Sequence, residues 1–277
     1  MNNTASNQWS KNIKVILLII IFLAGLAFLL NQVLSKPAPN KILIYTNIDN
    51  LSSKKETDLV LFLAGFTIGS PGLLANYDFG GLALSPYLED KYRKNIIFAS
   101  IDTIPVTHWG SPDAVKSILK NIKQLMKLYN IKRIFIIGGS MGSSLTLNLA
   151  SQADEEIKSK ITGVIAYLPI TDYDYTLQNT KNQSVKDAIL KHFSENKDES
   201  LIKKSSPITY INDLPEKIKI ILIATASDQT VPPEQVYTYF NKAKELGKNI
   251  ELYKVPGDHN TGYIQNVYRE LVLNLLK

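Results

Sequence analysis

A short glycine-rich motif holds the residue of this 277-residue chain best suited to act as a nucleophile. Residues 138–142 read Gly-Gly-Ser-Met-Gly and fit the pattern G-x-S-x-G. The motif directly follows the apolar run 132–137 and opens a segment, 141–151, that is expected to form a helix. A strand, a tight turn and a helix in this order present a serine hydroxyl above the end of a sheet. We therefore predict that Ser140 is a catalytic nucleophile.

A serine hydroxyl needs a base that takes its proton, and the chain has only three histidines. His259 lies in a Pro-Gly-Asp-His-Asn turn just after the last predicted strand, where open α/β sheets place catalytic groups. His108 precedes a predicted helix, and His192 lies in a polar stretch where a solvated position is expected. His259 is therefore the predicted base.

The base in turn needs a carboxylate, which fixes the tautomer of the imidazole and stabilises its protonated form. Asp228 follows the predicted strand 217–224 and precedes a helix that starts at a proline, and it is the preferred acid. Asp172 and Asp258 are its rivals. Asp258 is the weaker of the two because a residue adjacent to the histidine usually points away from it.

A nucleophilic serine also requires donors for the oxyanion that develops on the substrate. The backbone N–H of Met141, at the start of the predicted helix, is the expected first donor. The loop that follows the predicted strand 58–63 is expected to supply the second, with the Phe66 N–H preferred and Thr67 as the alternative.

The rest of the chain alternates short apolar runs with amphipathic segments. This rhythm predicts right-handed crossovers and a mostly parallel, doubly wound sheet, hence an α/β fold in one domain over 41–277. The predicted strands are 41–45, 58–63, 95–101, 132–137, 162–168, 217–224 and 249–253. The predicted helices are 111–129, 141–151, 185–193, 233–246 and 263–276.

One polar span, 171–211, fits the alternation poorly and is too long for a simple connection. We predict either a small cap over the substrate site or an ordinary surface excursion, with one modest helix near 185–193. Tyr173 and Tyr175 in this span could line a site for an acyl or aromatic group.

The N-terminal segment 13–30 contains eighteen residues with Lys14 as the single charge. A helix of this length spans roughly 27 Å, close to the hydrocarbon thickness of a bilayer. We expect an uncleaved transmembrane anchor between a polar tail, 1–12, and a linker, 31–40. The catalytic domain is then expected on the extracytoplasmic side; secretion after cleavage of a signal peptide is the alternative.

Composition excludes several classes of function. The chain has no cysteine, which rules out a thiolate nucleophile, disulfides and a Cys-ligated metal site. Three lysines within residues 1–36, namely Lys11, Lys14 and Lys36, supply half of the net charge of +6. The rest of the chain holds 28 basic and 25 acidic residues. Such a balance does not favour nucleic-acid binding. No metal-ligand cluster and no phosphate-binding loop occurs, so no metal or organic cofactor is expected.

Taken together, the motifs around Ser140, Asp228 and His259 resemble those of the α/β-hydrolase superfamily, over about residues 41–277. The stretch 206–211 is similar to the esterase and prolyl-oligopeptidase-like branches. The resemblance implies an eight-stranded sheet, with Ser140 as nucleophile, Asp228 as acid and His259 as base.

These observations predict a membrane-anchored serine hydrolase that cleaves a carboxylic ester, thioester or amide through an acyl-enzyme on Ser140, with peptidase activity also open. Its expected partners are a small-molecule or lipid-like acyl substrate and, through residues 13–30, a membrane. A binding module that keeps the fold without catalysis is one alternative. An acyltransferase with the same three residues is another.

Overall fold

A computed structural model describes most of the second of two units into which the chain divides, Met1–Pro39 and Asn40–Lys277. The predicted membrane segment 13–30 lies outside the described residues. Among the residues that are described, no helix combines the length and the apolar character needed to cross a membrane. The described residues are 42–46, 54–63, 65, 95–101, 108–195, 198, 200–259 and 263–276.

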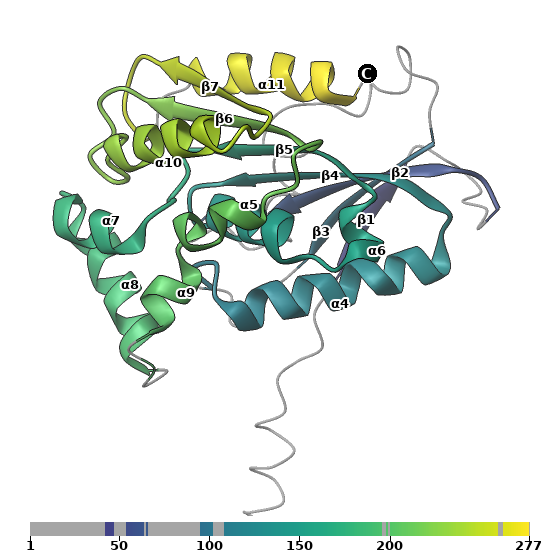
Figure 1. Ribbon diagram of the computed structural model, residues 1–277, viewed down its shortest axis with the longest axis horizontal. Coiled ribbons are helices and arrows are strands. Elements are labelled where there is room, and N and C mark those ends of the chain that lie inside the picture. Colours follow the sequence, from purple (N-terminus) through teal and green to yellow (C-terminus); the bar gives the residue numbers. More distant parts are fainter. Residues whose placement is uncertain are drawn as a thin grey trace, which may run out of the picture. The chain divides into compact units, whose positions relative to one another are not determined.

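The described strands form one sheet in the order β1-β3-β2-β4-β5-β6-β7 (Figure 1). Among the described strands only β1 runs antiparallel to its neighbour, so the prediction of a mostly parallel sheet is confirmed. Each of the seven predicted strands is present, and the implied eighth is not among the described residues. The strands are β1 (Ile42–Thr46), β2 (Thr57–Leu63), β3 (Ile96–Ile101), β4 (Ile131–Gly139), β5 (Ile161–Tyr167), β6 (Lys219–Thr225) and β7 (Ile250–Val255).

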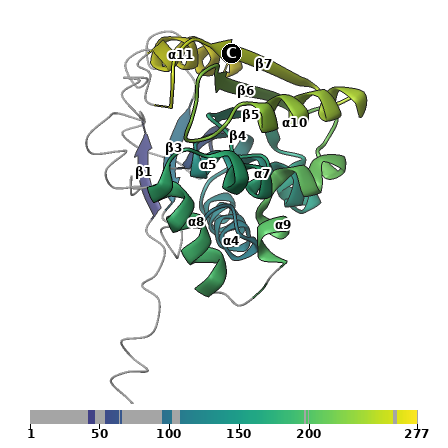
Figure 2. The ribbon, with the colours of Figure 1, turned by 90° about the vertical axis from the view of Figure 1, so that its left-hand side faces the viewer.

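Helices cover both faces of this sheet (Figure 2). The predicted helices are present to within about two residues at each end, which is the usual uncertainty of a helix boundary. The helical elements are α4 (Pro112–Leu128), α5 (Met141–Gln152), α6 (Glu155–Lys158), α7 (Tyr173–Asn179), α8 (Gln183–Glu195), α9 (Leu201–Ser205), the 3₁₀ helix η2 (Pro207–Asp213), α10 (Glu234–Glu245) and α11 (Tyr263–Leu276).

Strands β2 to β6 are buried along most of their length, as their continuous apolar runs predict, whereas β7 exposes Tyr253 and Lys254. Alternate residues of each strand join different cores because successive side chains point to opposite faces. In β4, Ile134 and Ile136 pack in the core that contains α4, α5 and α10. Phe135 and Ile137 pack in the core that contains α11. Each face thus has its own hydrophobic core.

The strand order determines where a site can form. The chain runs from β2 outward to β3 and then crosses back to β4, on the other side of β2. The carboxyl ends of β2 and β4 therefore lie side by side at the point where the direction of winding reverses. Open α/β sheets bind their ligands at such a point.

The span 171–211 is helical, in contrast to the single modest helix that its polar composition predicts. α7, α8, α9 and η2 occupy it, and α7, α8 and α9 lie together at one side of the sheet (Figures 1 and 2). We call residues 173–205 the cap. Its apolar residues form a third core with residues of the sheet edge: Trp109, Met141, Ile170, Tyr173, Leu177, Ile189, Phe193, Leu201 and Val231.

Two expectations for side chains of the cap are wrong. Tyr173 is fully buried, and its hydroxyl donates a hydrogen bond to Ser144 Oγ at 2.9 Å, so this ring supports the cap instead of lining an open site. His192 is buried as well, where a solvated position was expected. Its ring packs edge-on against Phe193 in the core of the cap. Tyr175 is half-buried.

Candidate active site

Ser140 occupies a strained turn between β4 and α5. Its backbone angles are φ 51° and ψ −118°, in a region that residues with a Cβ rarely adopt. Its N–H donates to the Tyr167 carbonyl of β5 at 2.9 Å, and its carbonyl accepts from the Ser143 N–H at 3.0 Å. These bonds hold the turn and leave the half-buried Ser140 side chain beyond the end of β4.

Gly138 makes this turn possible because the strand and the helix approach closely beside it. A Cβ at position 138 would lie 2.5 Å from the Gly142 carbonyl oxygen and would also overlap the Thr146 hydroxyl. Backbone atoms cannot withdraw as a side chain can. The glycine is therefore required by the packing of α5 against β4.

Gly138→Ala is expected to lower the free energy of unfolding by about 3 kcal/mol, the upper range for an overpacked core. Gly163→Ala is the matched control, because the nearest atoms to its Cβ belong to the movable side chain of Leu275. Urea unfolding of both variants measures the difference. Equal stabilities would contradict the role given to Gly138.

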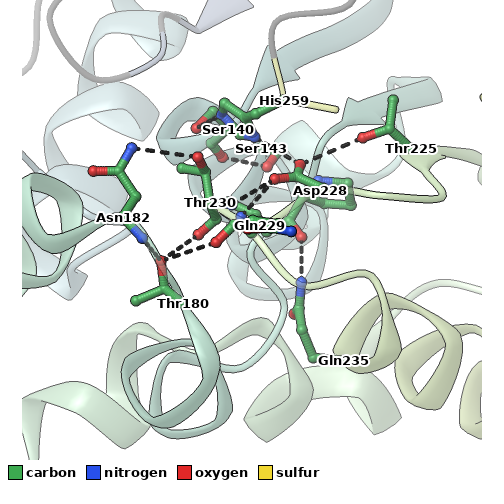
Figure 3. A network of polar contacts seen from close by, with 12 residues as sticks. Ser140, Ser143, Thr180, Asn182, Thr225, Asp228, Gln229, Thr230, Gln235 and His259 are labelled. Carbon is green, nitrogen blue, oxygen red and sulfur yellow. Dashed lines mark hydrogen bonds and ion pairs between the residues drawn. The ribbon is translucent and has the colours of Figure 1, made fainter. Parts of the chain in front are cut away.

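The structure brings Ser140, His259 and Asp228 together from three loops at the carboxyl ends of β4, β7 and β6 (Figure 3). His259 Nδ1 lies 2.7 Å from Asp228 Oδ2. His259 Nε2 lies 3.1 Å from Ser140 Oγ. The exposed fraction of the side chain is 17% for His259 and 2% for Asp228, so the carboxylate is shielded from water while the imidazole is accessible.

These distances define the proton positions. An ionised carboxylate only accepts hydrogen bonds, so the His259 Nδ1–H donates to Asp228. In the neutral imidazole, Nε2 is then the acceptor and receives the hydrogen bond of the Ser140 hydroxyl. This arrangement allows proton transfer from the serine to the histidine.

The other candidates for acid and base lie elsewhere. The carboxylate of Asp172 accepts from the Tyr175 N–H at 3.1 Å and caps α7. Asp258 is exposed. His108 is buried and accepts a hydrogen bond from the Gly110 N–H at Nδ1, 3.0 Å away.

One side of the predicted oxyanion site is described. Met141 is the first residue of α5, whose first N–H groups have no partner within the helix. Gly65 follows β2, and a Cβ built on it would lie 3.6 Å from Ser140 Cβ. The loop after β2 therefore begins beside the serine. Phe66 and Thr67 lie outside the described residues.

Comparisons with known proteins agree with this architecture. Residues 108–273, more than half of the chain, match the prolyl oligopeptidase family. No curated protein matches the chain. Among solved structures, the acylaminoacyl peptidase of Pyrococcus horikoshii is 14% identical with a TM-score of 0.58, and the match covers 88% of this chain and 42% of that one. The chain thus spans less than half the length of that peptidase.

Two esterase structures are also similar. A fungal esterase from Rhizomucor miehei is 18% identical with a TM-score of 0.64, and the match covers 87% of this chain and 79% of that chain. Esterase 2 of Thermogutta terrifontis, phosphonylated by sarin, is 19% identical with a TM-score of 0.62 over 87% of this chain and 90% of that one. At these identities the structures show a common fold. Together with the family match, they show that this chain belongs to the prolyl oligopeptidase family, within the α/β-hydrolase superfamily of serine hydrolases.

Proposed function

We propose that this protein cleaves a carboxylic ester, or a related thioester or amide, through an acyl-enzyme on Ser140. The observation that carries the proposal is the continuous hydrogen-bonded chain from Ser140 through His259 to the buried Asp228. A serine, an imidazole and a carboxylate in this geometry are the components of a catalytic triad.

In this mechanism, Ser140 Oγ attacks the carbonyl carbon of the substrate while His259 Nε2 takes the hydroxyl proton. Asp228 holds the imidazole in the required tautomer and stabilises its protonated form. The Met141 N–H donates to the oxyanion, together with the expected donor at Phe66. His259 then gives its proton to the leaving group. Water, activated by the same histidine, releases the acid from Ser140.

The likeness to two esterase structures supports an ester substrate. The chain matches Thermogutta terrifontis esterase 2 over 90% of that protein's length but covers only 42% of the acylaminoacyl peptidase structure. The sarin-modified esterase also supports the choice of an organophosphorus probe.

A fluorophosphonate probe is expected to label the folded full-length chain at Ser140, because such probes react with a serine that a base has activated. Labelling should disappear in Ser140→Ala, and a peptide carrying the label should map to residue 140 by mass spectrometry. A series of p-nitrophenyl esters beside a dipeptide-amide panel then separates esterase from peptidase activity. Failure of the folded wild type to react would overturn the proposal.

We also propose that residues 13–30 tether the domain to a membrane, which favours lipid-like acyl substrates near that surface. The apolar run of the sequence supports this location. The same probe tests it, since the labelled chain should sediment with membranes and resist extraction by high salt. Labelled protein in the soluble fraction alone would contradict the tether.

A further inference from the structure

The loop that carries Asp228 lies directly against the cap. We call residues 226–232 the acid loop and residues 180–182, between α7 and α8, the cap junction. Figure 3 shows the cap junction on one side of the acid loop residues Gln229 and Thr230, with the Asp228 carboxylate on the other. Hydrogen bonds run from both sides onto the same short piece of backbone.

The first of these bonds passes through the peptide unit between Gln229 and Thr230. Its carbonyl oxygen accepts from the Lys181 N–H of the cap junction at 2.8 Å. Its N–H donates to Asp228 Oδ1 at 2.9 Å. A peptide unit is planar and rigid. The position of this carbonyl against the cap junction therefore sets the position of the N–H that holds the acid.

The next peptide unit, between Thr230 and Val231, repeats the arrangement. Its carbonyl oxygen accepts from Thr180 Oγ1 at 2.9 Å. Its N–H donates to Asp228 Oδ1 at 2.8 Å. Two successive rigid units thus connect the cap junction to one carboxylate oxygen, and the other oxygen holds His259. Hydrogen bonds in such a chain polarise one another.

Packing holds the cap in the position that these bonds need. Thr180 is buried, with 9% of its surface exposed, so water does not readily replace its hydroxyl. Val231 of the acid loop and Met141, next to the serine, share the apolar core of the cap. Gln235 of α10 holds the segment that leads into the cap, since its Nε2 donates to the Pro169 carbonyl at 2.7 Å and its Oε1 accepts from the Asp172 N–H at 3.0 Å.

We infer that Thr180 and the Lys181 N–H are positioning groups for Asp228, so that docking of the cap sets the orientation of the acid and, through it, of His259. The inference rests on the proposed hydrolase function. Undocking the cap removes both partners of the acid loop carbonyls and frees the two peptide units that hold Asp228. Small displacements of catalytic groups carry large losses of rate.

Thr180→Val in the full-length chain tests the inference, because valine keeps the shape of threonine but cannot donate to the Thr230 carbonyl. We expect kcat for a p-nitrophenyl ester to fall about tenfold, in line with one lost hydrogen bond, and KM to stay within about twofold. Thr180→Ser keeps the hydroxyl and should restore kcat. The proton resonance of the His259 Nδ1–H···Asp228 bond, far downfield in the NMR spectrum, should weaken or shift in Thr180→Val alone.

Thr176→Val is the matched control. Thr176 is also buried, one turn earlier in α7, and its hydroxyl bonds to the Asp172 carbonyl at 2.7 Å instead of the acid loop. It should keep the wild-type kcat and the downfield resonance. An equal loss of kcat in Thr176→Val and Thr180→Val would show a general effect of cap stability and overturn the inference.

A second pair of variants tests the inference if Thr180→Val does not fold. Lys181→Pro removes the backbone N–H that bonds to Gln229, and Thr180 has backbone angles (φ −61°, ψ 136°) that a following proline permits. Lys181→Ala keeps the N–H, and its side chain is exposed in the wild type. Only Lys181→Pro should lower kcat and disturb the downfield resonance.

The two proposals fail in different ways. Suppose that the fluorophosphonate labels the wild type, but Thr180→Val and Lys181→Pro have the wild-type kcat and downfield resonance. The hydrolase function then stands, and the inference about the cap is wrong. A wild type that does not label overturns the hydrolase function. The resonance needs no turnover, so its response to the variants still supports or refutes the coupling between cap and acid.

Discussion

Asp228→Asn is expected to lower kcat on the order of 10⁴-fold while the protein stays folded. The reason lies in the partners of the carboxylate. Asp228 Oδ1 accepts from the N–H groups of Thr230 and Val231, at 2.9 and 2.8 Å. An asparagine must keep its carbonyl oxygen toward these two donors, because its amide nitrogen would face them as a third donor. The amide N–H₂ of the variant is therefore directed at His259.

This orientation reverses the tautomer of the base. An amide N–H₂ can only donate, so His259 Nδ1 becomes an acceptor and the imidazole proton moves to Nε2. Nε2 then donates toward Ser140 Oγ and cannot take the serine proton. The substitution changes a few atoms and leaves the hydrogen-bond geometry of the acid loop in place, so the loss falls on kcat and not on folding.

Asp172→Asn is the control for the rival acid. Its side chain caps α7 by accepting from the Tyr175 N–H, and asparagine caps helices as well as aspartate does. We expect its kcat to stay within about twofold of the wild type. Steady-state kinetics on one ester, with thermal unfolding of each variant, decides whether Asp228 or Asp172 is the acid. More than a tenth of the wild-type kcat in Asp228→Asn would contradict the role of Asp228.

The sheet and the neighbourhood of Ser140 are predictable from sequence because both depend on local patterns. Apolar runs buried on both faces indicate parallel strands, and β4 with Ser140 and α5 is one continuous segment with glycines at the close approach. The proximity of His259 and Asp228 could be predicted because each follows a strand that ends at the same edge of the sheet. Parallel strands bring such positions together whatever the sequence distance between them.

The cap could not be predicted in the same way. Two of its helices, α7 and α9, are short, and α8 buries only a few of its residues, so the segment has a polar composition. The bonds from Thr180 to the acid loop connect residues about fifty positions apart. A threonine in a polar stretch carries no sign of such a contact. The burial of His192 could not be predicted for the same reason, because the polar composition of its segment indicates a solvated position.

Acid is expected to destabilise the protein between about pH 6.5 and 4.5, chiefly through His108. Burial, with a smaller contribution from the nearby His192, lowers the pKa of His108 to about 3. Burial lowers the pKa of His192 too, against the opposing effect of Glu195. Protonation of His108 would also set a new N–H at Nδ1 against the Gly110 N–H, which donates there at 3.0 Å.

The loss of stability in acid follows from the difference between the pKa of His108 in the folded state and its pKa in the unfolded state. In the unfolded chain the histidine has its ordinary value near 6.5 and binds a proton below that pH, whereas the folded state stays neutral down to about pH 3. The unfolded state thus binds more protons throughout this window. Stability is complete above pH 6.5 and falls by roughly 1 kcal/mol per pH unit below it. The carboxylates with lowered pKa, Asp154 and Asp198, take up protons only below this window.

His108→Asn isolates the effect, because the asparagine Oδ1 can accept from the Gly110 N–H while carrying no titratable group. The variant leaves a small cavity and should be less stable than the wild type at pH 7. Its free energy of unfolding should nevertheless vary less with pH, with only the His192 contribution remaining. Urea unfolding from pH 7 to 4.5 measures both slopes. If the unfolding free energies of the wild type and of His108→Asn depend equally on pH, His108 takes up its proton in the folded state as it does in the unfolded state, which would contradict the prediction.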